Sequence, residues 1–112
     1  MQLETQKHLF DVLEAVKEIE AYVLGIDYVA FLSQSVTQAA VERKFEIIGE
    51  ALNRLQREDA EVFGQITGAQ RIISFRNILA HGYDVIDRAI VWDIIKNHMP
   101  ILRAESEKLL AI

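Results

Sequence analysis

The spacing of apolar residues constrains this chain more than any other feature of its sequence, because it repeats at three- and four-residue steps over most of the length. The first such stripe consists of Leu9, Val12, Leu13, Val16, Ile19 and Val23. It predicts a long first helix that ends near Gly25. Since a chain of 112 residues with 51% hydrophobic residues can bury one core, we expect a single domain over residues 1–112.

Three further helical signals follow. The stretch DYVAFLSQS favours a short helix or a turn that starts at Asp27. Thr37 is a suitable N-cap for a second long helix. The apolar stripe of that helix consists of Val41, Phe45, Ile48, Leu52 and Leu55. A third main helix is expected from about residue 69 or 70 to about Ala80, with Gly82 as its stop.

The last helical segment has two candidate caps, Asp84 and Asp87, and its apolar positions continue to Leu109. Pro100 lies inside this pattern and should kink the helix, because proline has no backbone N–H and its ring clashes with the preceding turn. The turn-rich stretch REDAEVFGQITGA separates the second and third helices. Together these signals predict an all-α fold, an antiparallel bundle of about four main helices.

Composition excludes several classes of function. There is no cysteine, and no apolar run approaches the roughly 20 residues that cross a bilayer. The stretch MQLETQKHLF lacks the basic start and apolar core of a signal peptide, so we expect a cytoplasmic protein without a membrane partner. A net charge of −5 argues against a broadly basic surface that coats nucleic acid, and no DNA partner is expected, but a local phosphate site is allowed. Three scattered histidines indicate no metal site, and no cofactor is expected.

The stretch RNILAHGYDV is the part of the chain that packing explains least, since it gathers Arg76, Asn77, His81 and Tyr83. Residues four apart share a helix face, so Asn77 and His81 point the same way. Arg76 and His81 are separated by about 140° on an ideal helix. They converge only if the helix ends or distorts at His81, which Gly82 allows. On spacing alone, a structural use of these residues is more common than a functional one.

The chemistry of these side chains is nevertheless specific. The planar guanidinium of arginine matches phosphate oxygens, and histidine can take or give a proton near neutral pH. In RNA, the 2′-hydroxyl beside each phosphodiester is an internal nucleophile. A base that deprotonates it and a cation that stabilises the developing charge are sufficient for cleavage without a metal. In such a site Asn77 would orient the histidine or bind the phosphate.

The sequence RNILAHGY, with EIIGEA upstream and IDRAIVWDII downstream, resembles the HepT-like branch of the HEPN superfamily over nearly the whole chain. The resemblance implies a HEPN-like helical domain that dimerises and acts as a metal-independent endoribonuclease. It assigns catalysis to Arg76 and His81, with Asn77 in support. It further implies the toxin of a type II or type VII toxin–antitoxin pair, whose nucleotidyltransferase antitoxin adds AMP to the motif tyrosine, here Tyr83.

Two other roles remain open. The chain would be a binding module if it docks a nucleotidyltransferase without cleaving RNA, and a purely structural dimer would not need His81 and Tyr83 exposed. A buried Arg76 locked in an ion pair, with His81 pointing inward, would favour one of these roles.

Residues outside the motif are expected to be mainly structural. Gly49 lies in the middle of a helix, where glycine is unfavourable, and close approach of a second helix is the expected reason. Glu46 and Glu50 share a helix face and either brace an arginine, such as Arg76, or are solvated. His8 is expected at the surface and His98 in a packed or hydrogen-bonded position. The aromatic residues Phe45 and Trp92 are expected to anchor the core or a dimer interface.

Overall fold

The computed structural model describes residues 1–80 and 86–111, and every regular element in this part of the chain is helical. The elements are α1 (Leu3–Tyr22), α2 (Tyr28–Leu32), α3 (Ser35–Glu58), α4 (Ala60–Phe63), α5 (Ala69–Ala80), α6 (Arg88–Asp93), the π-helix η1 (Ile94–His98) and α7 (Met99–Leu110). The predicted all-α fold is therefore confirmed.

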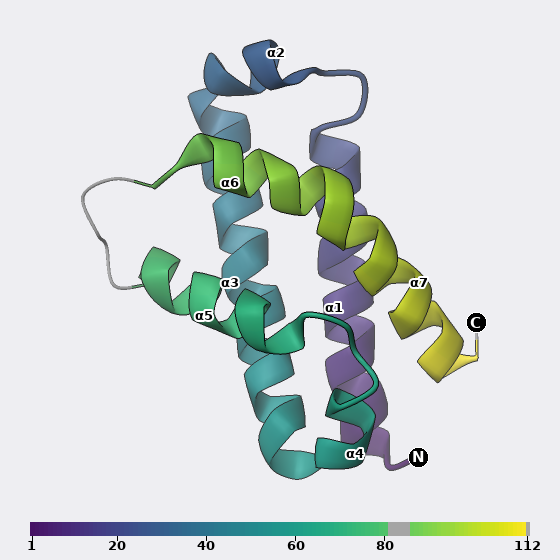
Figure 1. Ribbon diagram of the computed structural model, residues 1–112. Coiled ribbons are helices and arrows are strands. Elements are labelled where there is room, and N and C mark those ends of the chain that lie inside the picture. The colour runs from purple at the N-terminus through teal and green to yellow at the C-terminus, as the bar shows by residue number, and fades with distance from the viewer. Residues whose placement is uncertain (81–85, 112) are drawn as a thin grey trace.

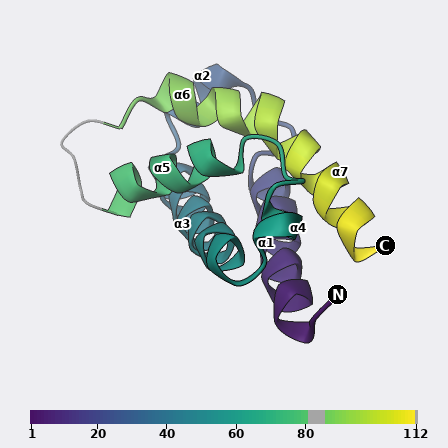
Figure 2. The same cartoon turned by 60° about the horizontal axis from the view of Figure 1, so that its bottom comes forward.

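The two long helices α1 and α3 lie side by side and run in opposite directions (Figure 1). The continuous run of α6, η1 and α7 passes diagonally over this pair, and α5 lies across α3 in both views (Figures 1 and 2). The main axes of the fold are thus α1, α3, α5 and the α6–α7 run. The crossing of α5 over α3 brings the arginine of the motif onto the second long helix.

The apolar stripes predicted for α1 and α3 form the core. All the stripe residues of α1 are buried, and those of α3 have no exposed surface at all. Phe45 lies at the α3–α5 contact, where its ring meets Phe75 edge-on at a centroid distance of 5.5 Å. Trp92 is half-buried, and its ring lies tilted against that of Phe31 at a centroid distance of 5.2 Å. Both aromatic residues therefore contribute to packing within the chain.

The predicted start of a helix at Asp27 and one of the two candidate caps, Asp87, are confirmed. The Asp27 side chain accepts a hydrogen bond from the Ala30 backbone N–H at 2.8 Å at the start of α2. Asp87 accepts from the Ala89 N–H at 2.9 Å at the start of α6. These bonds satisfy donors that the first turn of a helix leaves without a partner. The alternative cap Asp84 and the predicted stop Gly82 lie outside the described residues.

The prediction that Thr37 caps the second long helix is wrong. The helix begins at Ser35, and its N-cap residue is Gln34, three residues before Thr37. The Gln34 carbonyl already accepts the Gln38 backbone N–H at 3.0 Å, so Thr37 lies within the first turn. Its hydroxyl instead donates to Gln34 Oε1 at 2.9 Å. The buried Gln38 side chain donates to the Phe31 carbonyl at 2.8 Å, which ties this start to α2.

Pro100 disturbs the last helix one turn before its own position. The segment Ile94–His98 winds as a π-helix, and Pro100 follows it in the first turn of α7. Proline has no N–H to donate to the carbonyl four residues earlier, so the regular α-helical hydrogen bond is missing there. The wider π-helical turn accommodates this missing bond.

The predicted end of the first helix is close to the observed one. Helix α1 ends at Tyr22, and Gly25 follows with φ +77°. In the described part of the chain, no helix combines the length and apolar character that crossing a membrane requires.

Candidate active site

The site begins with a close contact between α3 and α5. A Cβ built onto Gly49 would lie 2.2 Å from Cβ and 2.5 Å from Cγ of Arg76. Carbon atoms normally approach to about 3.5–4.0 Å, so only glycine leaves room for α5 at this depth. The close helix approach predicted from the mid-helix glycine is confirmed, and its partner is the motif arginine itself.

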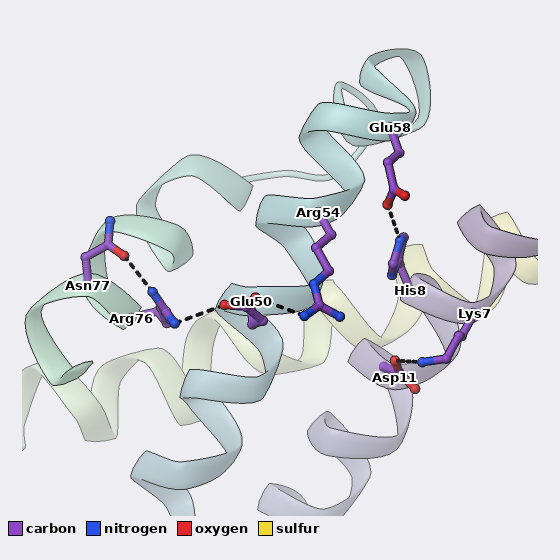
Figure 3. A network of polar contacts seen from close by, with 8 residues as sticks. All are labelled: Lys7, His8, Asp11, Glu50, Arg54, Glu58, Arg76 and Asn77. Carbon is purple, nitrogen blue, oxygen red and sulfur yellow. Dashed lines mark hydrogen bonds and ion pairs between the residues drawn. The ribbon is translucent and has the colours of Figure 1, made fainter.

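The Arg76 guanidinium lies between the two helices and is held from both sides (Figure 3). Its Nη2 donates to Glu50 Oε2 at 2.9 Å, and its Nη1 donates to Asn77 Oδ1 at 3.2 Å. Its Nε is buried and has no hydrogen-bond partner within the described ranges. The side chain as a whole keeps 29% of its surface exposed, so the guanidinium remains open to the pocket that it lines.

Glu50 binds a second arginine with its other oxygen. Glu50 Oε1 lies 3.3 Å from Arg54 Nη2, one helical turn along α3. The two guanidiniums therefore share one carboxylate (Figure 3). Of the two carboxylates predicted to brace an arginine, Glu50 contacts Arg76, whereas Glu46 pairs with Arg43 at 3.4 Å.

A polar pocket of about 290 Å³ opens around this pair. It is lined by His8, Asp11, Arg43, Glu46, Ile47, Glu50, Ala51, Arg54 and Arg76. The lining combines three guanidiniums with three carboxylates at the junction of α1, α3 and α5. Multiple fixed N–H donors of this kind suit an anionic group with several oxygen atoms.

A second, apolar cleft of about 450 Å³ lies between α5 and α6. Its apolar lining includes Ile72, Phe75, Ile78, Ile86, Ile90 and Ile94. Two of these side chains are strongly exposed, Ile78 at 45% and Ile90 at 52%. Large exposed aliphatic side chains that gather in one groove are a common sign of a protein–protein contact.

The other predicted site residues are only partly placed. Asn77 is exposed on α5 and contacts Arg76. His81 and Tyr83 lie outside the described residues, so their convergence with Arg76 stays a prediction. The helix that carries Arg76 and Asn77 is described as far as Ala80, and His81 is the next residue in the sequence.

The surface position predicted for His8 is wrong. The residue is 7% exposed, and its Nε2 is hydrogen-bonded to the Glu58 carboxylate. Nearby, the Thr5 hydroxyl donates to Asp59 Oδ2 at 3.0 Å. These partners lie at the far end of α3, so the antiparallel packing of α1 and α3 explains the burial. His98 keeps 40% of its side chain exposed and lies 3.8 Å from Asp93 Oδ2, so the packed or hydrogen-bonded position predicted for it is not confirmed.

Sequence reasoning missed Arg54. The sharing of Glu50 between Arg54 and Arg76 depends on how α5 crosses α3, which the local sequence does not show. A retrievable signal was the i, i+4 spacing of Glu50 and Arg54, which predicts a contact on one helix face.

The fold and the pocket define an all-α protein with a guanidinium-lined polar site at the crossing of two helices. The family model described as "Ribonuclease HepT-like" matches residues 12–109. The chain therefore belongs to the HepT-like ribonuclease family.

Similar proteins agree with this assignment. The chain is 32% identical over 104 residues to a protein of Methanocaldococcus jannaschii named as a putative RNase, covering 93% of this chain and 94% of that one. It is 31% identical over 109 residues to a protein of Thermococcus cleftensis named as a probable ribonuclease HepT, covering 97% and 98%. A putative RNase of Caldanaerobacter subterraneus is 28% identical, covering 92% and 91%. No solved structure matches the chain.

Proposed function

We propose that the chain is a metal-independent endoribonuclease that acts as the toxin of a toxin–antitoxin pair. The observation that carries the proposal is the position of Arg76, which is held by Glu50 and Asn77 at the edge of an open polar pocket. Membership in a ribonuclease family supports RNA as the substrate. The whole of residues 1–112 serves as one HEPN-like domain in this proposal.

In the proposed reaction, His81 is the general acid/base and Arg76 binds the scissile phosphate. His81 removes the proton of the 2′-hydroxyl, and the resulting oxygen attacks the adjacent phosphorus. The bond from phosphorus to the 5′-oxygen breaks, and the protonated His81 returns its proton to that oxygen as it leaves. The products are a 2′,3′-cyclic phosphate and a free 5′-hydroxyl. Arg76 stabilises the charge that develops on the phosphate oxygens, and Asn77 supports its position.

The ion pair of Arg76 also favours a second candidate, a non-catalytic binding partner of a nucleotidyltransferase. An arginine engaged by a carboxylate at 2.9 Å must exchange part of that contact to bind a phosphate. The Arg76 side chain is 29% exposed and lines a pocket, however, so a phosphate can approach it without unfolding the helix crossing. This accessibility makes the ribonuclease the stronger candidate.

Dimerisation and control by an antitoxin complete the proposal. The apolar cleft with the exposed Ile78 and Ile90 is the part of the described surface that best suits a second copy of the chain. A stable interface centred there would bury on the order of 1,200–2,000 Å² in total. Two copies joined there would bring their motif segments to one cleft. AMP added to Tyr83 by the nucleotidyltransferase would place a phosphate close to Arg76 and silence the enzyme.

The test of the function is an RNA cleavage assay with the purified full chain in excess EDTA, followed by analysis of the RNA ends. We expect cleavage to continue and the ends to be 2′,3′-cyclic phosphate and 5′-hydroxyl. Cleavage that stops in EDTA and returns with magnesium would refute the metal-independent mechanism. If no RNA is cleaved while the chain binds and is modified by a nucleotidyltransferase, the binding-partner role is correct.

A further inference from the structure

Two arginines from different helices contact opposite oxygens of one carboxylate at the polar pocket. We propose that Arg54 is a second RNA-binding residue, which takes the backbone phosphate next to the one bound by Arg76. Arg54 and Arg76, joined by Glu50, form an arginine pair. This inference rests on the proposed ribonuclease function and extends its site along α3.

The charge balance of this cluster differs from that of other ion pairs in the protein. Arg88 has its own carboxylate, Glu42, at 2.7 Å. Arg103 contacts two carboxylates, Glu20 and Glu107. The arginine pair, in contrast, shares Glu50 alone within 4 Å among the described residues. One unit of positive charge is therefore uncompensated within this cluster, although the whole chain has a net charge of −5.

The donor atoms of the pair are also incompletely used. Each guanidinium has five N–H donors in a planar fork. Arg76 uses Nη1 and Nη2, while its Nε has no partner within the described ranges. Arg54 approaches Glu50 with one nitrogen, and its side chain is 53% exposed. Both residues line the same pocket.

These features suit a phosphodiester better than other anions. A phosphodiester carries one negative charge on two non-bridging oxygens, which the guanidinium fork can bind at two points. In the proposed function, Arg76 binds the phosphate that is cut. Arg54 stands one helical turn beyond Glu50, and a turn rises about 5.4 Å along the helix. A single strand that leaves Arg76 along α3 therefore meets Arg54 with its neighbouring phosphate.

The first measurement is steady-state cleavage of a single-stranded RNA by the wild type and by Arg54→Ala. We expect KM to rise about tenfold and kcat to stay within about twofold, because a lost charge-assisted hydrogen bond to a bound phosphate weakens binding by about this factor. Arg54→Lys keeps the charge but not the planar fork, so its KM should lie between that of the wild type and that of Arg54→Ala. Lys108→Ala removes the same charge from an exposed site on α7 and should match the wild type.

The second measurement separates RNA contact from a structural role. In an His81→Ala background, which prevents cleavage, RNA affinity is measured over a range of salt concentrations. Each phosphate contact contributes about −0.7 to the slope of log K against log salt for a single strand. Arg54→Ala should make the slope shallower by about 0.7, and Lys108→Ala should leave it unchanged.

The outcomes distinguish this inference from the function on which it rests. If the wild type neither binds nor cleaves RNA, the proposed function fails and the inference fails with it. If the wild type cleaves RNA and Arg54→Ala keeps the wild-type KM and salt slope, the inference alone is overturned. A fall in kcat with an unchanged KM and slope would also overturn it, since Arg54 would then act by positioning Arg76.

Discussion

Replacing Gly49 by alanine should damage the site more than the fold. The added Cβ would lie 2.2 Å from Arg76 Cβ, so reaching a normal contact of ~3.5 Å requires about 1.3 Å of movement. The clash involves the base of the arginine side chain, which cannot move unless α5 moves. Overpacking of this kind costs about 1–3 kcal/mol, while the better helix propensity of alanine returns about 1 kcal/mol. We therefore expect a net loss of roughly 0–2 kcal/mol in the free energy of unfolding.

The effect of this change on activity should be larger. Displacement of about 1 Å at a positioned group can cost about 10²-fold in rate. The Arg76 contact with Glu50 at 2.9 Å would lengthen or break as α5 moves. The two measurements are urea unfolding and the rate of RNA cleavage, made on the same preparation. We expect cleavage to fall about 100-fold while the protein remains folded.

Gly64→Ala is the matched control. A Cβ at Gly64 would meet its nearest atoms at 3.4 and 3.5 Å, which is ordinary contact. Its stability should change by no more than about 0.5 kcal/mol, and its activity should not change. If Gly49→Ala is as stable and as active as the wild type, the helix contact does not hold Arg76 in place and the reasoning is refuted.

The remaining predictions concern the motif and the proposed dimer. His81→Ala should lower RNA cleavage by about 10²–10⁴-fold, Arg76→Ala should abolish cleavage, and neither should change the melting temperature much. Full growth inhibition by either variant would show that the assigned roles are wrong. Tyr83→Phe should still cleave RNA but escape modification, so after co-expression with the nucleotidyltransferase the intact mass should show AMP additions on the wild type alone. Equal additions on both proteins would place the acceptor elsewhere. Ile90→Glu puts a charge into the apolar cleft and should convert a dimer to a monomer in light scattering, whereas a wild type that is already monomeric at micromolar concentration would refute the dimer itself.

Local features of the fold were predictable because they depend on neighbours in the sequence. The helix predicted to begin near residue 69 or 70 begins at Ala69, and Asp27 and Asp87 cap the helices that follow them. Periodicity fixed which residues face the core, since 3.6 residues per turn places a stripe on one side whatever the partner is. The start predicted at Thr37 was wrong, since α3 begins at Ser35 and its first turn includes Gln38, which bonds to the Phe31 carbonyl, a contact that the local sequence does not predict.

The sequence by itself determined the all-α class, the apolar stripes and the identity of the motif residues, because periodicity and motif spacing are written along the chain. Only the tertiary structure decided which groups meet at the site. His8 is buried because antiparallel packing brings Glu58 to it from 50 residues away. Arg76 meets Glu50 across 26 residues because α5 crosses α3 at a glycine. Arg54 joins that contact for the same reason: charges pair by distance in space, and the crossing of the helices sets that distance.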